Sequence, residues 1–126
     1  MDGWVGVDLD GTLAEYNGWE GPASIGPPIQ PMVQRVKRWL AQGVDVRICT
    51  ARVTDNINRS VAIPAIEAWC QEHIGQTLLF GTKDFGMIEM WDDRSIAVEV
   101  NTGRILGGFS RLEEALEKIN DPYIQI

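Results

Sequence analysis

The sequence reads WVGVDLDGT from Trp4 to Thr12, a short apolar run that leads directly into two aspartates. The apolar run predicts a buried strand, and Asp8 and Asp10 leave its end on the same side because side chains alternate along a strand. Gly11 permits a sharp turn there, and the Thr12 hydroxyl can orient a carboxylate. Two close carboxylates repel each other unless a cation or a shared proton lies between them. This pattern suits Mg²⁺-assisted transfer through an aspartyl intermediate; the simpler alternative is an ordinary Asp-Gly turn.

Length and composition bound the class of protein. The chain has 126 residues and a net charge of −7, so we expect one domain over residues 1–126 and no coating of nucleic acid or anionic membranes. Cys49 and Cys70 lack CxxC spacing and are expected in the core, and the single histidine, His73, cannot form a histidine metal site. Without a signal peptide or a long apolar run, a cytoplasmic protein without a membrane partner is the expectation.

Apolar periodicity predicts strands that alternate with helices. Strands are expected at residues 4–8, 44–49, 78–80 and 87–91, and helices at 31–42, at 63–74 with Pro64 in its first turn, and after Ser110. A hairpin is expected from 96–100 and 104–106, and an extended tail at 121–126. The fold class is therefore α/β, a Rossmann-like three-layer fold with a mainly parallel sheet, helices on both faces and a C-terminal β-hairpin. The last helix should bury one apolar stripe, formed by Leu112, Ala115, Leu116 and Ile119.

Polar residues follow four of the expected strands, and ligands bind at the carboxyl ends of the strands in such sheets. The candidates are Asp8 and Asp10 after the first strand, Thr50 and Arg52 after the second, Lys83 after the third, and Asp92 and Asp93 after the fourth. Each group also has an ordinary explanation: Thr50 could cap the next segment, Lys83 could be a solvated loop lysine, and Asp92-Asp93-Arg94 could be a surface turn.

The order Asp-x-Asp-Gly-Thr, then Thr, Lys and Asp-Asp resembles the haloacid dehalogenase superfamily, over residues 5–106. Most members are Mg²⁺-dependent phosphotransferases and phosphatases. The resemblance implies that Asp8 is the nucleophile, that Asp10 is the general acid and base, and that Thr12 helps to orient Asp10. It also implies that Thr50 bonds the phosphoryl oxygens and that Lys83 balances their charge.

The same resemblance implies a Mg²⁺ ion held by Asp8, the Asp10 carbonyl, and Asp92, Asp93 or both. Oxygen ligands of this kind are those that Mg²⁺ prefers. Arg52 is expected on the substrate side of the site, and so are Tyr16 and Trp19, which would line its entrance. With Thr12, these form the expected substrate-binding set: Thr12, Arg52, Tyr16 and Trp19.

The intervals between the motifs leave no room for a separate cap domain. The Gly- and Pro-rich loop 15–31 is the one segment expected to cover the site. An open site suits a phosphorylated substrate that is large, such as a nucleic-acid end, a phosphoprotein or a lipid-linked phosphate. A small substrate is also possible if a second protomer covers the site.

Two other functions remain open from the residues. The chain could be a catalytically silent binding module that keeps the fold. A phospho-accepting receiver domain has a similar Asp, Thr and Lys set, but its acidic pair comes first, whereas Asp92-Asp93 comes last here and no Asp ends the second strand.

Overall fold

The computed structural model describes residues 2–120, which form two compact units divided between Asp93 and Arg94. The extended tail expected at 121–126 lies outside these residues. The single domain expected over residues 1–126 remains a prediction. None of the described helices is long and apolar enough to cross a membrane.

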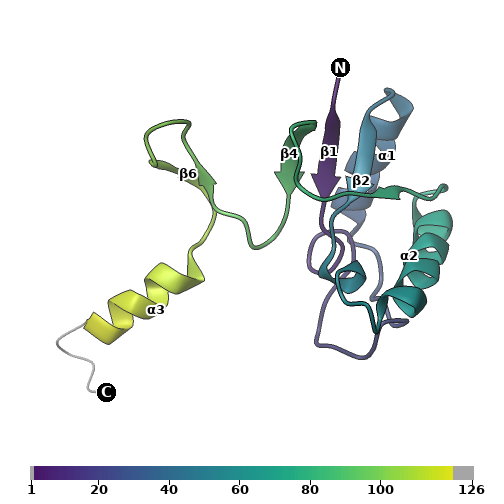
Figure 1. Cartoon of the computed structure of the whole chain (residues 1–126), viewed down its shortest axis with the longest axis horizontal. Coiled ribbons are helices and arrows are strands. Elements are labelled where there is room, and N and C mark those ends of the chain that lie inside the picture. The colour runs from purple at the N-terminus through teal and green to yellow at the C-terminus, as the bar shows by residue number, and fades with distance from the viewer. Residues whose placement is uncertain (1, 121–126) are drawn as a thin grey trace. The chain divides into compact units, whose positions relative to one another are not determined.

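The first unit contains a four-stranded, fully parallel sheet (Figure 1). Its strands are β1 (Trp4–Val7), β2 (Asp45–Ile48), β3 (Leu79–Phe80) and β4 (Met87–Trp91), in the order β3-β2-β1-β4. All four lie within the expected ranges, and the parallel α/β sheet is confirmed. Val7 pairs with Ile48 on one side and with Trp91 on the other, so β1, β2 and β4 end at the same level.

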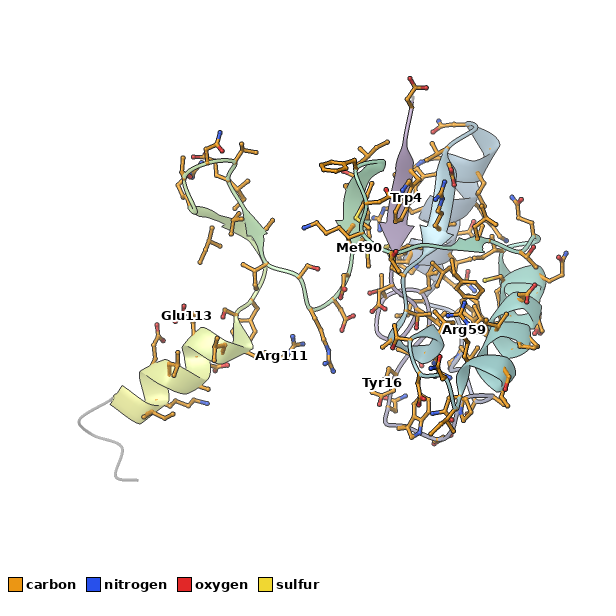
Figure 2. All side chains as sticks on the ribbon, viewed as in Figure 1. Trp4, Tyr16, Arg59, Met90, Arg111 and Glu113 are labelled. Atoms are coloured by element: carbon orange, nitrogen blue, oxygen red, sulfur yellow. The ribbon has the colours of Figure 1, made fainter. Side chains whose placement is uncertain are left out.

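Helices α1 (Gln30–Ala41) and α2 (Arg59–His73) bury their apolar side chains against one face of this sheet. Val33 of α1 and Ile66 of α2 belong to the same buried cluster as Val7 and Ile48. The other face of β1 and β2 carries Trp4, which is labelled in Figure 2, and Arg47, whose guanidinium stacks on the Trp4 ring. The connection 81–86 covers that face within the first unit, because Gly81 and Gly86 lie against the Trp4 ring.

The start of α2 corrects one expectation. The helix begins at Arg59, and Pro64 lies inside it and not in its first turn. Asp55 stabilises the turn before the helix by accepting the Ile57 amide, and the Asn58 carbonyl accepts the amides of the first helical turn. Pro64 removes one backbone bond. Burial of Ala62 and Ile66 on either side of it offsets that loss.

The second unit consists of the antiparallel hairpin of β5 (Ala97–Val98) and β6 (Ile105–Gly107), followed by α3 (Arg111–Asn120). The hairpin and the helix cap are confirmed, since the Ser110 hydroxyl accepts the Glu113 amide at 3.0 Å. Within the second unit the α3 stripe is not covered, because Leu112, Ala115, Leu116 and Ile119 are all exposed there. The expected burial of this stripe therefore stays a prediction. A two-stranded hairpin is too small to provide a covering layer for a helix, and no residue of 94–119 is buried.

Candidate functional site

Three carboxylates gather where β1 and β4 end side by side. The Asp8 amide donates to the Trp91 carbonyl at 2.9 Å, which places Asp8 beside Asp92 and Asp93. One carboxylate oxygen from each aspartate lies within 4.8 Å of the other two. Asp8 and Asp92 are half-buried and Asp93 is exposed. The structure therefore brings together three of the four expected metal-binding residues, and we call them the carboxylate cluster.

The turn after β1 holds Asp8 at this edge. Leu9 and Leu13 are fully buried, and the Leu13 amide donates to the Leu9 carbonyl at 2.9 Å. Gly11 has a φ of +85°, which favours glycine, and a Cβ on Gly11 would meet the Asp93 carboxylate at 2.7 Å. Glycine is therefore needed both for the turn, as expected, and for the space that Asp93 occupies.

Thr12 fixes the third carboxylate of the cluster. Its buried hydroxyl donates to Asp93 Oδ1 at 3.2 Å and accepts the Asp93 amide at 3.1 Å. The resemblance gives this hydroxyl to Asp10, but here it orients Asp93. The two contacts tie the turn after β1 to the residues after β4, although these segments are far apart in the sequence.

The cluster places three acidic groups close together at a partly buried edge of the sheet. Burial, a hydrogen bond with the Asp93 carboxyl group and the charge of Asp92 raise the pKa of Asp8 from 3.8 to about 7. The ionised form of Asp8 is thus disfavoured in the absence of a cation. Carboxylates at this spacing offer hard oxygen donors, so Mg²⁺ fits the donor set.

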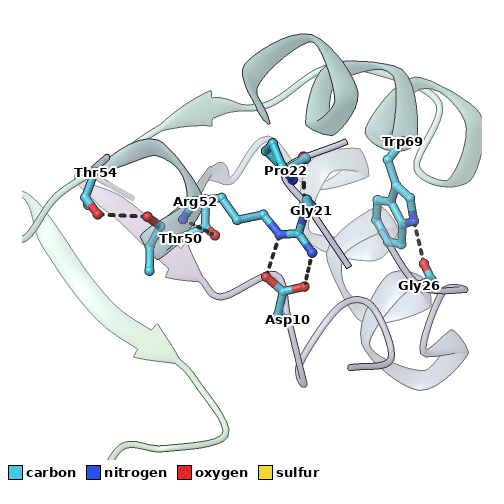
Figure 3. A network of polar contacts seen from close by, with 9 residues as sticks. Asp10, Gly21, Pro22, Gly26, Thr50, Arg52, Thr54 and Trp69 are labelled. Atoms are coloured by element: carbon cyan, nitrogen blue, oxygen red, sulfur yellow. Dashed lines mark hydrogen bonds and ion pairs between the residues drawn. The ribbon is translucent and has the colours of Figure 1, made fainter. Parts of the chain in front are cut away.

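Asp10 lies in a different environment, shown in Figure 3. Arg52 Nε donates to Asp10 Oδ2 at 2.7 Å and Arg52 Nη2 donates to Asp10 Oδ1 at 2.9 Å. Arg52 Nη1 also donates to the carbonyls of Gly21 and Pro22 at 3.4 and 3.3 Å. Only 6% of Arg52 is exposed, so this ion pair is shielded from solvent.

Thr50 and Arg52 enter the site from the segment after β2. The Cys49 amide donates to the Val7 carbonyl at 2.9 Å, so Thr50 follows a strand end adjacent to that of Asp8. The buried Thr50 hydroxyl accepts the Arg52 amide at 3.2 Å and caps the short 3₁₀ helix Ala51–Val53. The capping expected as the ordinary explanation of Thr50 is therefore present, and it fixes the Thr50 side chain at the strand end.

The loop 15–31 has no helix or strand before α1, and it is fastened at both ends and in the middle. The Glu15 amide donates to the Pro27 carbonyl at 2.9 Å, and the Trp69 indole donates to the Gly26 carbonyl at 2.9 Å. Trp19 lies over the Arg52 guanidinium, with 5.0 Å from Cζ to the ring centroid. Tyr16, labelled in Figure 2, is 44% exposed, and Trp19 is 53% exposed.

Lys83 is not brought to the carboxylates by any contact among the described residues. It is exposed, and the segment that contains it leads to the opposite edge of the sheet. Asp84 accepts the Trp4 indole N–H at 2.9 Å, and the Gly86 carbonyl accepts the Trp4 amide at 2.8 Å, at the beginning of β1. The physical reason is the absence of a helix between β3 and β4, which lets residues 81–86 cross the sheet directly.

Sequence reasoning missed two contacts of this site. It assigned Arg52 to the substrate and not to Asp10. The Thr50-Ala51-Arg52 spacing indicates that Thr50 and Arg52 share one turn, but not that Arg52 pairs with Asp10. It also missed that Asp93 lies against Gly11 and Thr12, for which no sequence signal exists. Both cysteines were expected in the core. This is confirmed for Cys70, which is buried and whose pKa is raised to about 12 by that burial, whereas Cys49 is only half-buried.

No protein-family model, no curated protein and no solved structure matches this chain.

Proposed function

We propose that the protein is a Mg²⁺-dependent phosphomonoester hydrolase that works through an aspartyl-phosphate on Asp8. The observation that carries this proposal is the carboxylate cluster at the carboxyl edge of a parallel sheet, with the pKa of Asp8 raised to about 7. Ligands of open α/β sheets bind at this edge. The order of the groups along the chain is the reason to place the protein in the haloacid dehalogenase superfamily.

Mg²⁺ is the proposed cofactor, with Asp8, Asp92 and Asp93 as its carboxylate ligands. The Asp10 backbone carbonyl is the further ligand that the resemblance implies. When bound, the ion would offset the negative charge that the phosphoryl group brings to Asp8. The raised pKa of Asp8 supports this assignment, because it reflects burial together with the nearby Asp93 and Asp92 carboxyl groups, and a bound cation would favour the ionised form.

In the proposed reaction, an Asp8 carboxylate oxygen forms a bond to phosphorus and the bond to the leaving oxygen breaks. The leaving oxygen keeps the bonding electron pair and takes a proton from Asp10, which must first take up that proton from solvent because Arg52 pairs with its carboxylate form in the free protein. Asp10 then takes a proton from water, whose oxygen attacks phosphorus; the Asp8–phosphorus bond breaks and inorganic phosphate is released. In the free protein both Asp10 oxygens are bonded by Arg52, so substrate binding must exchange one of these bonds for the leaving oxygen.

Two further groups are proposed to act on the phosphoryl oxygens. Thr50 lies at the adjacent strand end and has a hydroxyl hydrogen to donate. Lys83 is retained as the charge-balancing residue on sequence order alone. Lys83→Ala separates the two possibilities for that lysine: an unchanged kcat would assign it to solvent.

The substrate side of the proposed site is open, without a cap domain, and the loop 15–31 is its cover. The substrate is then a large phosphorylated molecule, such as a nucleic-acid end, or a smaller one covered by a second protomer.

The test is turnover of a generic aryl phosphate with and without Mg²⁺, by the native protein and by Asp8→Asn. We expect Mg²⁺-dependent release of phosphate, and a loss of about 10³-fold or more in Asp8→Asn because the nucleophile is removed. Asp45→Asn is the matched control, since Asp45 is an exposed aspartate at the beginning of β2 and not at its carboxyl end. Absence of turnover, or turnover that Asp8→Asn retains, would contradict the proposal.

A further inference from the structure

The leaving-group side of the site can be located from Asp10. This step rests on the proposed function: if Asp10 protonates the leaving oxygen, the leaving group must lie next to Asp10. The described groups on that side are Arg52, which bonds both Asp10 oxygens, and the loop segment that Arg52 also contacts. The identity of these neighbours then determines what leaving group fits.

Trp19 is the large apolar group of that loop segment. One face of its indole lies against the Arg52 guanidinium, at 5.0 Å from Cζ to the ring centroid. More than half of Trp19 is nevertheless exposed, at 53%. The glycines at 18 and 21 on either side leave open space, since a Cβ on either would meet no described atom within 4 Å.

The indole is held in place although it is exposed. Arg52 is 6% exposed and uses its guanidinium for Asp10, for two loop carbonyls and for the Trp19 face. The loop is also fastened to α2 through the bond from Trp69 to the Gly26 carbonyl (Figure 3). A rigid aromatic ring binds a planar partner at low entropic cost, because little motion is lost on binding.

We propose that Trp19, held beside Asp10 by Arg52, is a stacking platform for a leaving group that carries a planar aromatic ring. The substrate class is then a phosphomonoester of a nucleoside, in which the base stacks on Trp19 while the ester oxygen faces Asp10. Arg52 is a positioning residue in this account: it fixes both the platform and Asp10.

The test compares two substrates that differ only in the base, a nucleoside 5′-monophosphate and ribose 5-phosphate. Stacking of a base on an aromatic side chain is typically worth enough that Trp19→Ala should raise KM for the nucleotide about 10-fold or more. The KM for ribose 5-phosphate should stay unchanged, because its phosphoryl contacts remain. Trp19→Phe should retain part of the preference for the nucleotide.

Arg52→Lys should also lose the preference, because an ammonium cannot bond both Asp10 oxygens and stack flat on the indole. Arg47→Lys is the matched control: Arg47 makes a two-point ion pair with Asp45 and stacks on Trp4, but outside the site. It should leave both KM values unchanged. Melting temperatures are measured on every variant. If Trp19→Ala fails to fold, Trp19→Leu replaces it, because leucine keeps an apolar side chain but has no ring on which a base can stack.

Equal KM values for the two substrates in the native protein, or an equal effect of Trp19→Ala on both, would overturn the platform. Failure of the proposed function looks different, since neither substrate would then be hydrolysed with Mg²⁺. In that case, calorimetric binding of the nucleotide and of ribose 5-phosphate still tests the platform. Weaker nucleotide binding by Trp19→Ala supports it, and identical binding by the native protein and the variant contradicts it.

Discussion

The carboxylate cluster and the Asp10–Arg52 pair lie around the same short turn, yet their electrostatics are opposite. Asp8 faces two further carboxylates, and its pKa rises to about 7. Asp10, two residues later, has both oxygens bonded by a buried guanidinium. The difference teaches that neighbouring aspartates of one motif can take separate roles, because distant segments supply their partners: residues after β4 for Asp8, and residues after β2 for Asp10.

The strongest test of this difference is Asp10→Asn, which removes the compensated carboxylate. A general acid typically contributes about 10²–10⁴-fold, so we expect kcat to fall by that range for a phosphate ester with a poor leaving group. The loss should be much smaller for an aryl phosphate with an acidic leaving group, which needs little protonation. Measuring kcat over a series of leaving groups checks this.

Asp45→Asn is the control for that series, because Asp45 also pairs with an arginine through both oxygens but lies on the surface. It should not change kcat for any member of the series. An equal loss for good and poor leaving groups in Asp10→Asn would reject the acid role and leave Asp10 as an anchor for Arg52.

The next effect concerns the carboxylate cluster. Asp92→Asn removes one carboxylate of the cluster, and we expect the affinity for Mg²⁺ to fall by about tenfold or more. The rise in melting temperature with added Mg²⁺ measures that affinity, because a ligand of the folded state stabilises it by mass action. An Asp92→Asn variant that responds to Mg²⁺ as the native protein does would place the ion elsewhere.

The raised pKa of Asp8 predicts how stability depends on pH without metal. Between about pH 4 and pH 7, Asp8 is ionised in the unfolded chain but protonated in the folded protein, so the folded state binds more protons. The contribution of Asp8 to stability therefore falls as the pH rises through this window. We expect Asp8→Asn, compared with the native protein, to remove a decline on the order of a few degrees in melting temperature.

Added Mg²⁺ should reverse that decline in the native protein at pH 7 and have little effect on Asp8→Asn. Melting curves at pH 4, 5.5 and 7, with and without Mg²⁺, separate these cases. If the difference between the two proteins were the same at every pH, Asp8 would not be the titrating group.

The smallest expected effect comes from Thr12→Val. The Thr12 hydroxyl makes two bonds to Asp93 in a buried position, and their loss should lower the free energy of unfolding by about 1–2 kcal/mol. Thr102 is a matched control, because its hydroxyl also donates to a carboxylate and accepts an amide, but on the surface. Thr102→Val should change the free energy of unfolding far less; equal effects would show that Thr12 has no special role in orienting Asp93.

Much of the first unit could be predicted from the sequence, because its strands and helices follow clear apolar periods. The parallel sheet and the gathering of Asp8, Asp92 and Asp93 at its carboxyl edge agree with expectation. The position of Lys83 could not be predicted, because it depends on the direct crossing from β3 to β4. The Arg52–Asp10 pair joins residues from two strand ends, and local patterns do not encode such a pairing.

The second unit shows what apolar periodicity does not predict. The α3 stripe has a clear helical spacing, and a helix forms there with the expected Ser110 cap. Within the second unit, no described residue covers its apolar side chains. Spacing predicts that a helix will form and which of its residues share a face, but it does not predict what that face contacts.

The central claim is that a divalent cation lies in the carboxylate cluster and that Asp8 accepts the phosphoryl group. The most direct measurement is a crystal structure with Mn²⁺ in place of Mg²⁺ and with beryllium fluoride as the phosphoryl mimic. We predict an anomalous Mn²⁺ signal among Asp8, Asp92 and Asp93, and the fluoride adduct bonded to an Asp8 carboxylate oxygen. An ordered Mn²⁺ bound elsewhere, or an adduct on another residue, would contradict the account.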